Sequence, residues 1–263
     1  MQARVVPAAR GWAWVVEGFR MFRVAPLAWL ALVFAYWMAM TVISLVPYVG
    51  VAVASILVPA FSVGFMAASR AAQHRTSPAL SMLGAGFRDH LPAQLALGGV
   101  YFAALVVLLA ASALADDGTL TRWMATGEKP SPEALGSDEF LSALMLFAAL
   151  YAPVMMAFWF APLLVAWHGL SAAKALFFSF FASLMNWRAF VVYGTGTALV
   201  LFILPSLLVL GAMFVTGGTT RIALLSVLFP FLLTLLPTLF ASFYASYRDV
   251  FDARSVPPAE VAA

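Results

Sequence analysis

Long apolar blocks alternate along this chain with short segments that carry nearly all of its charge. The first block lies between Arg23 and Arg70, where 46 consecutive residues include no formally charged side chain. A membrane-spanning helix needs about 20 apolar residues, so this block is long enough for two helices. Its centre reads VPYVG, and proline and glycine are the residues that end helices and form turns. The pattern predicts helices over 25–46 and 49–69, joined by a tight turn.

Four further apolar blocks are each long enough to cross a membrane once. They lie at 91–115, 140–167, 189–214 and 222–247. Together with the first pair they make six crossings, which place both ends of the chain on the same side of the membrane. The sequence therefore predicts an all-α polytopic membrane bundle of six transmembrane helices, forming a single membrane domain over residues 1–263.

The composition agrees with a membrane protein. Hydrophobic residues make up 64% of the 263 residues and charged residues only 10%, whereas a soluble domain carries about 25% charged residues. The chain has no cysteine, which excludes disulfides and cysteine-ligated metal centres. Its net charge of +3 is explained by basic segments on the cytoplasmic side of a membrane, and we expect no nucleic-acid partner.

Lysine and arginine are distributed unevenly between the two sides of the predicted bundle. Eleven fall on the side that holds both termini, and three fall on the other side. Basic connections remain in the cytoplasm, so both termini are predicted to be cytoplasmic. The loop at 115–139, which carries six acidic residues, is predicted to face outward.

The basic segment before each pair of spans is predicted to form a helix that lies flat on the cytoplasmic surface. In the segment 7–23, apolar residues recur at helical spacing, while Arg10 and Glu17 occupy another face. Amphipathic helices rich in tryptophan and arginine are typical of the headgroup layer. The segments 77–92 and 168–188 hold the same place in the pattern. The segment 168–188 has one polar stripe and is also compatible with a seventh crossing, which would move the C-terminus outside.

Two of the predicted spans carry nearly the same sequence. The stretches VPAFSVGFMAASR and LPTLFASFYASYR place Pro59 and Pro237 eleven residues before Arg70 and Arg248, with phenylalanine and alanine at matching positions. A looser copy begins at Pro162. We interpret the pattern as triplication of one hairpin in parallel orientation, although chance recurrence in apolar helices would give similar matches. The predicted units are repeats at 7–69, 70–167 and 168–248, followed by a flexible cytoplasmic tail at 249–263.

The chain resembles a family of small, uncharacterised inner-membrane proteins of beta-proteobacteria in VVPAARGWAWVVEGFRMF, SLVPYVG and FWFAPLLVAWHGLSAAKALFFSFFASLMNWRAF. The resemblance covers most of residues 4–252 and implies a bacterial inner-membrane location. More remotely, the chain is similar to the membrane domain of some bacterial glycerophosphodiester phosphodiesterases. Their catalytic barrel is absent here, so the similarity implies no phosphodiesterase activity.

No constellation in the sequence predicts catalysis. A charge at the bilayer centre costs at least about 2.5–3.5 kcal/mol and usually marks a functional site, and none of the predicted spans contains one. His74, His90 and His168 lie at or beside the cytoplasmic boundary, where a surface role is more common than metal or haem ligation. We therefore expect a protein that is not an enzyme and that holds neither cofactor nor metal.

Two sets of residues are candidates for binding. Prolines inside spans free backbone carbonyls and kink helices, and three of them would line a central cavity under threefold symmetry: Pro59, Pro162 and Pro237. Six cations would form a ring at headgroup depth that holds anionic lipids: Arg20, Arg23, Arg70, Arg88, Lys174 and Arg188. The alternative explanations are helix curvature for the prolines and membrane anchoring for the cations.

These observations favour a non-enzymatic scaffold or accessory subunit of a membrane complex, in contact with membrane lipids and with other subunits. The alternative is a transporter or binder of a lipid or small apolar solute, with a cytoplasm-facing central cavity lined by the second, fourth and sixth helices. A third hypothesis is an intramembrane enzyme, but the sequence shows no identifiable set of acid, base or metal-binding residues for one.

Overall fold

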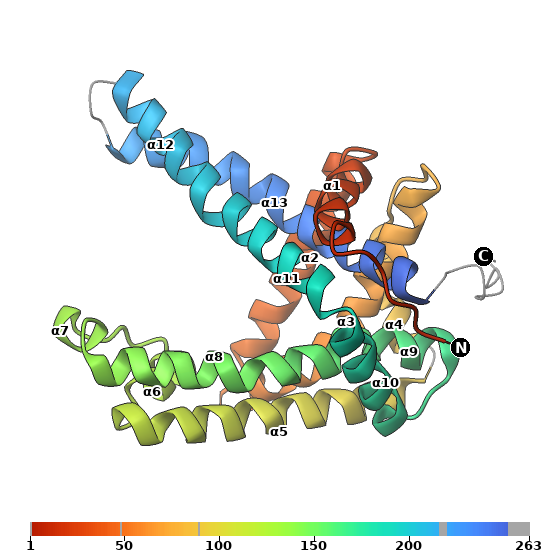
Figure 1. Ribbon diagram of the computed structural model, residues 1–263, viewed down its shortest axis with the longest axis horizontal. Helices are drawn as coiled ribbons and strands as arrows, with labels where there is room; N and C mark the ends of the chain where they lie inside the picture. The colour runs from red at the N-terminus through yellow and green to blue at the C-terminus, as the bar shows by residue number, and fades with distance from the viewer. Residues whose placement is uncertain (1, 48, 89, 216–219, 252–263) are drawn as a thin grey trace.

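The computed structural model describes residues 2–47, 49–88, 90–215 and 220–251, except for the side chains of 215–230. All regular secondary structure in these ranges is helical (Figure 1). The long helices form three antiparallel pairs, and a shorter helical segment precedes each pair.

The first pair follows directly from the charge-free block of the sequence. It comprises α1 (Arg10–Phe22), α2 (Pro26–Ser44) and α3 (Gly50–Gln73). Pro26 occupies the first turn of α2, where its missing N–H leaves no hydrogen bond unmade. A Cβ on Gly50 would stand 2.8 Å from the Ser44 carbonyl oxygen, so glycine permits the tight turn between α2 and α3. The helices predicted over 25–46 and 49–69 are confirmed, with α3 four residues longer at its end.

The second pair is more interrupted than the first. It comprises the 3-10 helix η1 (Leu80–Gly84), α4 (Ala85–Arg88), α5 (Leu91–Asp116), α6 (Thr119–Thr126), α7 (Pro132–Leu135), α8 (Asp138–Phe158) and α9 (Ala161–His168). The continuous surface helix predicted over 77–92 is wrong, because this segment forms only η1 and one turn of α4. The backbone there presses on α3: a Cβ on Gly86 would stand 2.9 Å from the Ala60 Cα.

The span predicted over 140–167 is broken between α8 and α9, next to Pro162. Two serines from α10 (Ala172–Met185) satisfy the interrupted backbone. The Ser179 hydroxyl accepts the Phe160 N–H at 2.9 Å and donates to the Met156 carbonyl at 2.9 Å. The Ser183 hydroxyl donates to the same carbonyl at 3.2 Å. The polar stripe of the segment 168–188 therefore serves internal hydrogen bonds.

The third pair contains a local change of helix type. It comprises α11 (Trp187–Ala198), a π-helical turn η2 (Leu199–Ile203), α12 (Leu204–Val215) and α13 (Thr220–Phe251). The π turn precedes Pro205, which cannot donate a backbone hydrogen bond, and such turns accommodate this interruption without ending the helix. The predicted tail at 249–263 begins too early, because α13 continues to Phe251, and 252–263 lie outside the described residues.

Five helices within the described ranges are long and apolar enough to cross a membrane. They are Pro26–Ser44, Gly50–Gln73, Leu91–Asp116, Asp138–His168 and Trp187–Phe214. The sixth predicted span lies within α13, whose side chains are described only from residue 231 onward. Helix α10 has 14 residues, a length of about 21 Å at 1.5 Å per residue, which is short of the ~30 Å apolar layer.

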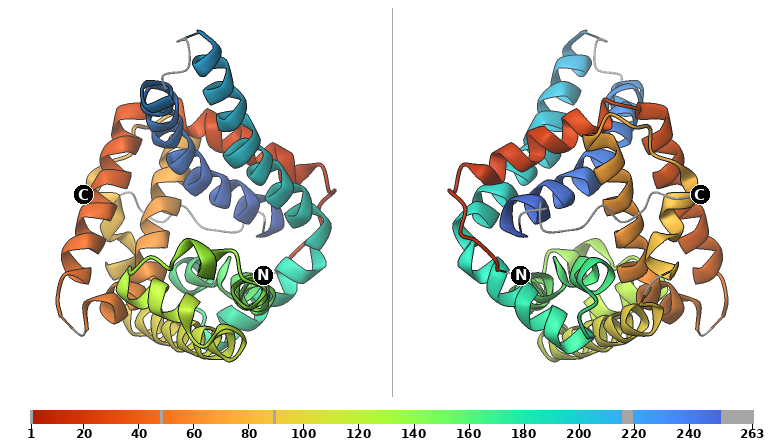
Figure 2. Two further views of the ribbon diagram at one scale, coloured as in Figure 1. Left: turned by 90° about the vertical axis from the view of Figure 1, so that its left-hand side faces the viewer. Right: turned by 90° about the vertical axis from the view of Figure 1, so that its right-hand side faces the viewer.

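The three pairs diverge from a common junction. In Figure 1, α5 and α8 lie side by side while α12 and α13 extend away from them. Figure 2 shows that α12 and α13 extend away from α5 and α8 in the turned views as well, whereas α3 packs against α5. At the opposite end, α1, α3, α9 and α13 contact one another around a core that includes Trp14, Trp29, Phe65 and Phe160.

Candidate functional site at the junction of α1, α3 and α13

Two glycines let α1 approach its neighbours at backbone distance. A Cβ on Gly11 would stand 2.7 Å from the Tyr193 nitrogen of α11, and one on Gly18 would stand 2.9 Å from the Ser242 nitrogen of α13. Real Cβ atoms do not approach backbone this closely, so only glycine is compatible with both crossings. Helix α1 is therefore packed into the fold along one face.

The apolar face of α1 is divided between the core and the surface. Trp14 is fully buried, and its ring contacts Phe190 and Tyr193 of α11 at centroid distances of 5.4 Å and 6.0 Å. Trp12 and Phe19 remain 47% and 41% exposed. The surface helix predicted over 7–23 thus docks through a face that includes its glycines, Trp14 and Phe22, while Trp12 and Phe19 are partly exposed.

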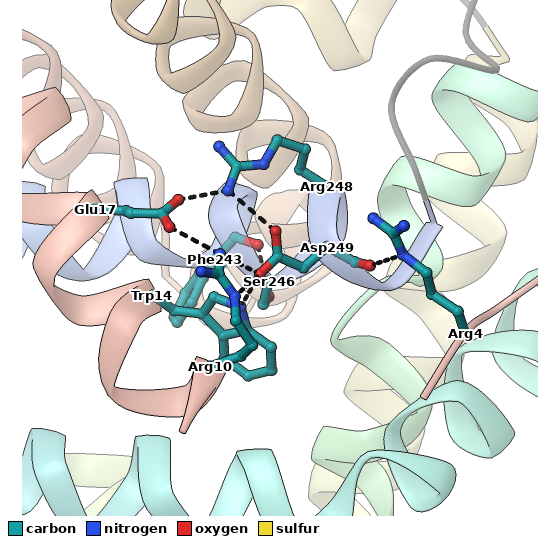
Figure 3. A network of polar contacts seen from close by, with 8 residues as sticks. All are labelled: Arg4, Arg10, Trp14, Glu17, Phe243, Ser246, Arg248 and Asp249. Atoms are coloured by element: carbon teal, nitrogen blue, oxygen red, sulfur yellow. Dashed lines mark hydrogen bonds and ion pairs between the residues drawn. The ribbon is translucent and has the colours of Figure 1, made fainter. Parts of the chain in front are cut away.

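Four charged residues join α1 to the end of α13 (Figure 3). Arg10 donates to Glu17 at 2.8 Å and to Asp249 at 2.6 Å. Arg248 contacts Asp249 at 3.0 Å and also donates to Glu17. The Trp14 indole N–H donates to Asp249 at 2.9 Å, so the buried ring is tied to the same carboxylate.

The charged side chains of this network are only partly exposed, so their free energy depends on each charge having a partner. The Asp249 and Glu17 side chains are 12% and 19% exposed. Partial burial lowers the pKa of Arg10, but its hydrogen bonds to Asp249 and Glu17 and the charges of both acids outweigh that effect and raise the pKa above its ordinary value. An unpaired charge at this depth would be costly, so the four side chains hold α1 and α13 in one arrangement.

A cleft of about 570 Å³ opens beside this network. It is lined by Glu17, Arg20, Met21, Arg23, Val24, Ala72, Gln73, Arg75 and Arg248. The residues come from the C-terminal half of α1 and the turn after it, from the end of α3 and the turn after it, and from the end of α13. Within the described residues, no hydrogen bond or ion pair engages the guanidinium groups of Arg20, Arg23 or Arg75.

The cleft contains two of the six cations that the sequence suggested as a lipid ring, Arg20 and Arg23. Arg70 instead lies over the Trp167 ring at 5.7 Å, and Arg188 lies over Trp187 at 5.5 Å. Arg88 and Lys174 are exposed on α4 and α10 and do not line the cleft. The predicted ring of six remains a prediction, whereas a cluster that includes Arg75 and Arg248 was missed.

The three candidate prolines occupy packed positions. Pro59, Pro162 and Pro237 are all buried. The Pro162 carbonyl accepts a hydrogen bond from buried Gln94 at 2.8 Å. Between α3 and α13, the Phe65 and Phe240 rings stack at 4.0 Å. None of these prolines lines the arginine-rich cleft, and the central cavity remains a prediction.

These features define an all-helical membrane protein with a charged, arginine-rich junction between its short first helix and its last helix. A protein of Burkholderia thailandensis described as a "probable inner membrane protein" is 40% identical over 262 residues, which cover 97% of this chain and 95% of that protein. The chain belongs to the same family as that protein. No protein-family model and no solved structure matches the chain. None of these comparisons supports the remote similarity to glycerophosphodiester phosphodiesterases.

Proposed function

We propose that this chain is a non-enzymatic protein of the bacterial inner membrane that acts as a scaffold or accessory subunit of a membrane complex. It crosses the membrane six times, as three related hairpins with both termini in the cytoplasm. The observation that carries the scaffold role is how little of each span the chain itself covers. The percentage compared is the share of an apolar 18-residue stretch of each span that is buried inside the protein. This share is 44% for Gly50–Gln73, but only 11% for Asp138–His168 and 6% for Trp187–Phe214.

Such open spans suit contact with other proteins. Lipid chains are as apolar as leucine, so helices in a membrane associate through close packing and not through the hydrophobic effect. The diverging pairs α5–α8 and α12–α13 leave whole helix faces available for packing by another subunit (Figure 1). Large side chains on these faces include Phe202 and Leu210, which are 68% and 62% exposed.

The packing around the glycines of two units supports the repeat. Gly18 of α1 lies against the backbone of Thr238 in α13, and Gly86 of α4 lies against the backbone of Ala60 in α3. Thr238 follows Pro237 and Ala60 follows Pro59, so both contacts fall at the same position of the two similar stretches of sequence. The short helix before each pair thus packs on the second long helix of another pair: α1 packs on α13, and α4 packs on α3. The short helix before the third pair, α10, packs on α8 and α9 of the second pair.

A binder of a lipid or small apolar solute is the second candidate. An apolar groove of about 630 Å³ runs beside the contact of α1 with α13, and its lining includes Trp12 and Phe19 of α1, Leu208 of α12 and Leu235 of α13. This groove lies to the side of the junction and differs from the central cavity that the sequence suggested. Its lining suits an acyl chain, which has no polar groups to satisfy.

Site-specific photo-cross-linking in native membranes tests the scaffold role. A photoreactive residue at Phe202 or Leu210 is expected to give a protein adduct of one defined mass, identified by mass spectrometry. The matched control is Leu45, which is 74% exposed but lies in the α2–α3 turn. Adducts with lipid alone at Phe202 and Leu210 would contradict a scaffold, and a lipid adduct specific to Leu208 would favour the second candidate.

A further inference from the structure

We propose that the cleft between α1, α3 and α13 binds the phosphate group of an anionic ligand through Arg20, Arg23 and Arg75. The proposal does not depend on the scaffold role, because it rests only on the geometry of this junction. Arginine suits phosphate because its planar guanidinium presents several N–H donors that match the phosphate oxygens. The ligand is a phospholipid headgroup or a soluble phosphate, and the experiment below separates the two.

The charges around the cleft do not balance. Arg248 is paired with Glu17 and Asp249, so neither it nor Glu17 contributes a free charge. Arg20, Arg23 and Arg75 remain as three cations on a shared concave surface, without a carboxylate partner in the described part of the chain. Like charges gathered around one cleft repel each other, and a bound anion would relieve that repulsion.

Arg75 stands at a position where the backbone favours another residue. Its φ of 59° lies in the left-handed region, immediately after α3 ends. The Thr76 N–H donates to the Ala71 carbonyl and the Arg75 N–H to the Ala72 carbonyl, which is the helix-ending motif that usually has glycine at this residue. An arginine here adopts a strained conformation although its side chain is exposed. Anion binding supplies a reason for an arginine at this residue.

The setting of the cleft favours a lipid as the source of the phosphate. Its walls include the apolar side chains of Met21, Val24 and Ala72 beside the arginines. The cleft lies at the ends of α3 and α13, which is headgroup depth for the proposed topology. The Arg23 guanidinium also lies over the Phe19 ring at 5.9 Å, so one face of this cation is already in apolar contact.

Native mass spectrometry of the purified full chain in detergent tests the proposal. The probes are phosphatidylglycerol, phosphatidylcholine as the zwitterionic control, and inorganic phosphate. We expect phosphatidylglycerol to bind at least about tenfold more tightly than phosphatidylcholine, since each arginine near a headgroup contributes roughly a few-fold in affinity. The triple variant R20Q/R23Q/R75Q is expected to lose that preference.

A matched triple variant separates the cleft from general surface charge. R88Q/K174Q/R188Q removes the same number of exposed cations, namely three members of the predicted ring of six that do not line the cleft. Because the cleft and not the ring is proposed to hold the phosphate, this variant is expected to bind as the unaltered chain does. An equal loss in both triple variants would overturn the proposal in favour of diffuse attraction. Unchanged binding in R20Q/R23Q/R75Q would also overturn it.

The single variant R75G guards against loss of folding. Glycine suits the left-handed backbone, so the melting temperature should not fall while the preference for phosphatidylglycerol weakens. Retained preference in R75G would remove Arg75 from the site and overturn the proposal as stated. Displacement of the lipid by millimolar inorganic phosphate would assign a soluble phosphate as the ligand, and persistence of the lipid would assign a headgroup. Both of these outcomes support a phosphate site.

Discussion

Gly18 of α1 and Thr238 of α13 lie so close that no side chain fits between the two helices. The contact joins the first helix of the chain to the last, so it closes the junction from which the three helix pairs diverge. Gly86 and Ala60 make the corresponding contact one unit further along the chain. The two contacts provide a direct test of whether the units share their packing.

Gly18→Ala and Gly86→Ala are each expected to destabilise the protein by about 1–3 kcal/mol, because the added methyl group overlaps backbone that cannot move freely. The measurement is the midpoint of thermal unfolding in detergent, followed by tryptophan fluorescence. Gly99→Ala is the control, since a Cβ there meets nothing within 4 Å, and alanine should favour the helix. A loss for Gly18→Ala without one for Gly86→Ala would argue against equivalent units.

The ion network predicts a coupled pair of substitutions. Glu17→Gln leaves Arg10 and Arg248 with only Asp249 between them, so we expect it to cost about 1–2 kcal/mol, less than a fully buried pair would. Arg248→Gln should cost a similar amount. The double variant should lose less than the sum of the two single variants, because the residues contact each other.

Thermal unfolding of the four proteins of this cycle gives the coupling energy. The side chains are only 19% and 26% exposed, so the coupling should persist at high salt, which screens exposed charges but not partly buried ones. Strict additivity of the two substitutions would show that the pair does not hold α1 to α13.

The serines at the break between α8 and α9 are expected to differ in importance. Ser179→Ala leaves the buried Phe160 N–H without its acceptor, which should cost about 1–3 kcal/mol. Ser183→Ala removes only a second donor to the Met156 carbonyl, which Ser179 also satisfies, so its cost should be smaller. Equal losses in the thermal midpoint would contradict this assignment.

The sequence predicted five long apolar helices well and the junction poorly, for a physical reason. A span is a local property, because about 20 uncharged residues are required wherever the helix packs. The network between Arg10 and Asp249 joins residues 239 positions apart, and no local pattern indicates which cations and acids will meet. The polar stripe on the segment 168–188 was visible, but its role depended on a break in a helix some twenty residues earlier.

The arginine cleft also could not be predicted from local sequence patterns. Arg20 and Arg23 were recognised as cations near the membrane surface, whereas Arg75 looked like one more charge in a connection. Its left-handed backbone and its place beside α1 appear only in the fold. The glycines of α1 carried a usable signal, since glycines at positions 11 and 18 share one helix face and reduce helix propensity without a local reason.

The absence of cysteine from the sequence permits a clean test of topology. Ser131, Ser171 and Trp187 are exposed, so each can be replaced singly by cysteine and treated with a membrane-impermeant maleimide. Ser131 lies in the loop proposed to face outward, and Ser131→Cys should be labelled in intact spheroplasts. Ser171→Cys and Trp187→Cys lie on either side of α10 and should be labelled only after the membrane is permeabilised.

The two positions beside α10 decide between six and seven crossings. A helix lying flat on the inner surface keeps Ser171 and Trp187 on the cytoplasmic side, whereas a crossing would move Trp187 outward. Helix α10 has 14 residues, which are too few to cross without thinning the bilayer. Labelling of Trp187→Cys in intact spheroplasts would therefore overturn the six-span topology, and with it the placement of Arg248 and the arginine cleft on the cytoplasmic side.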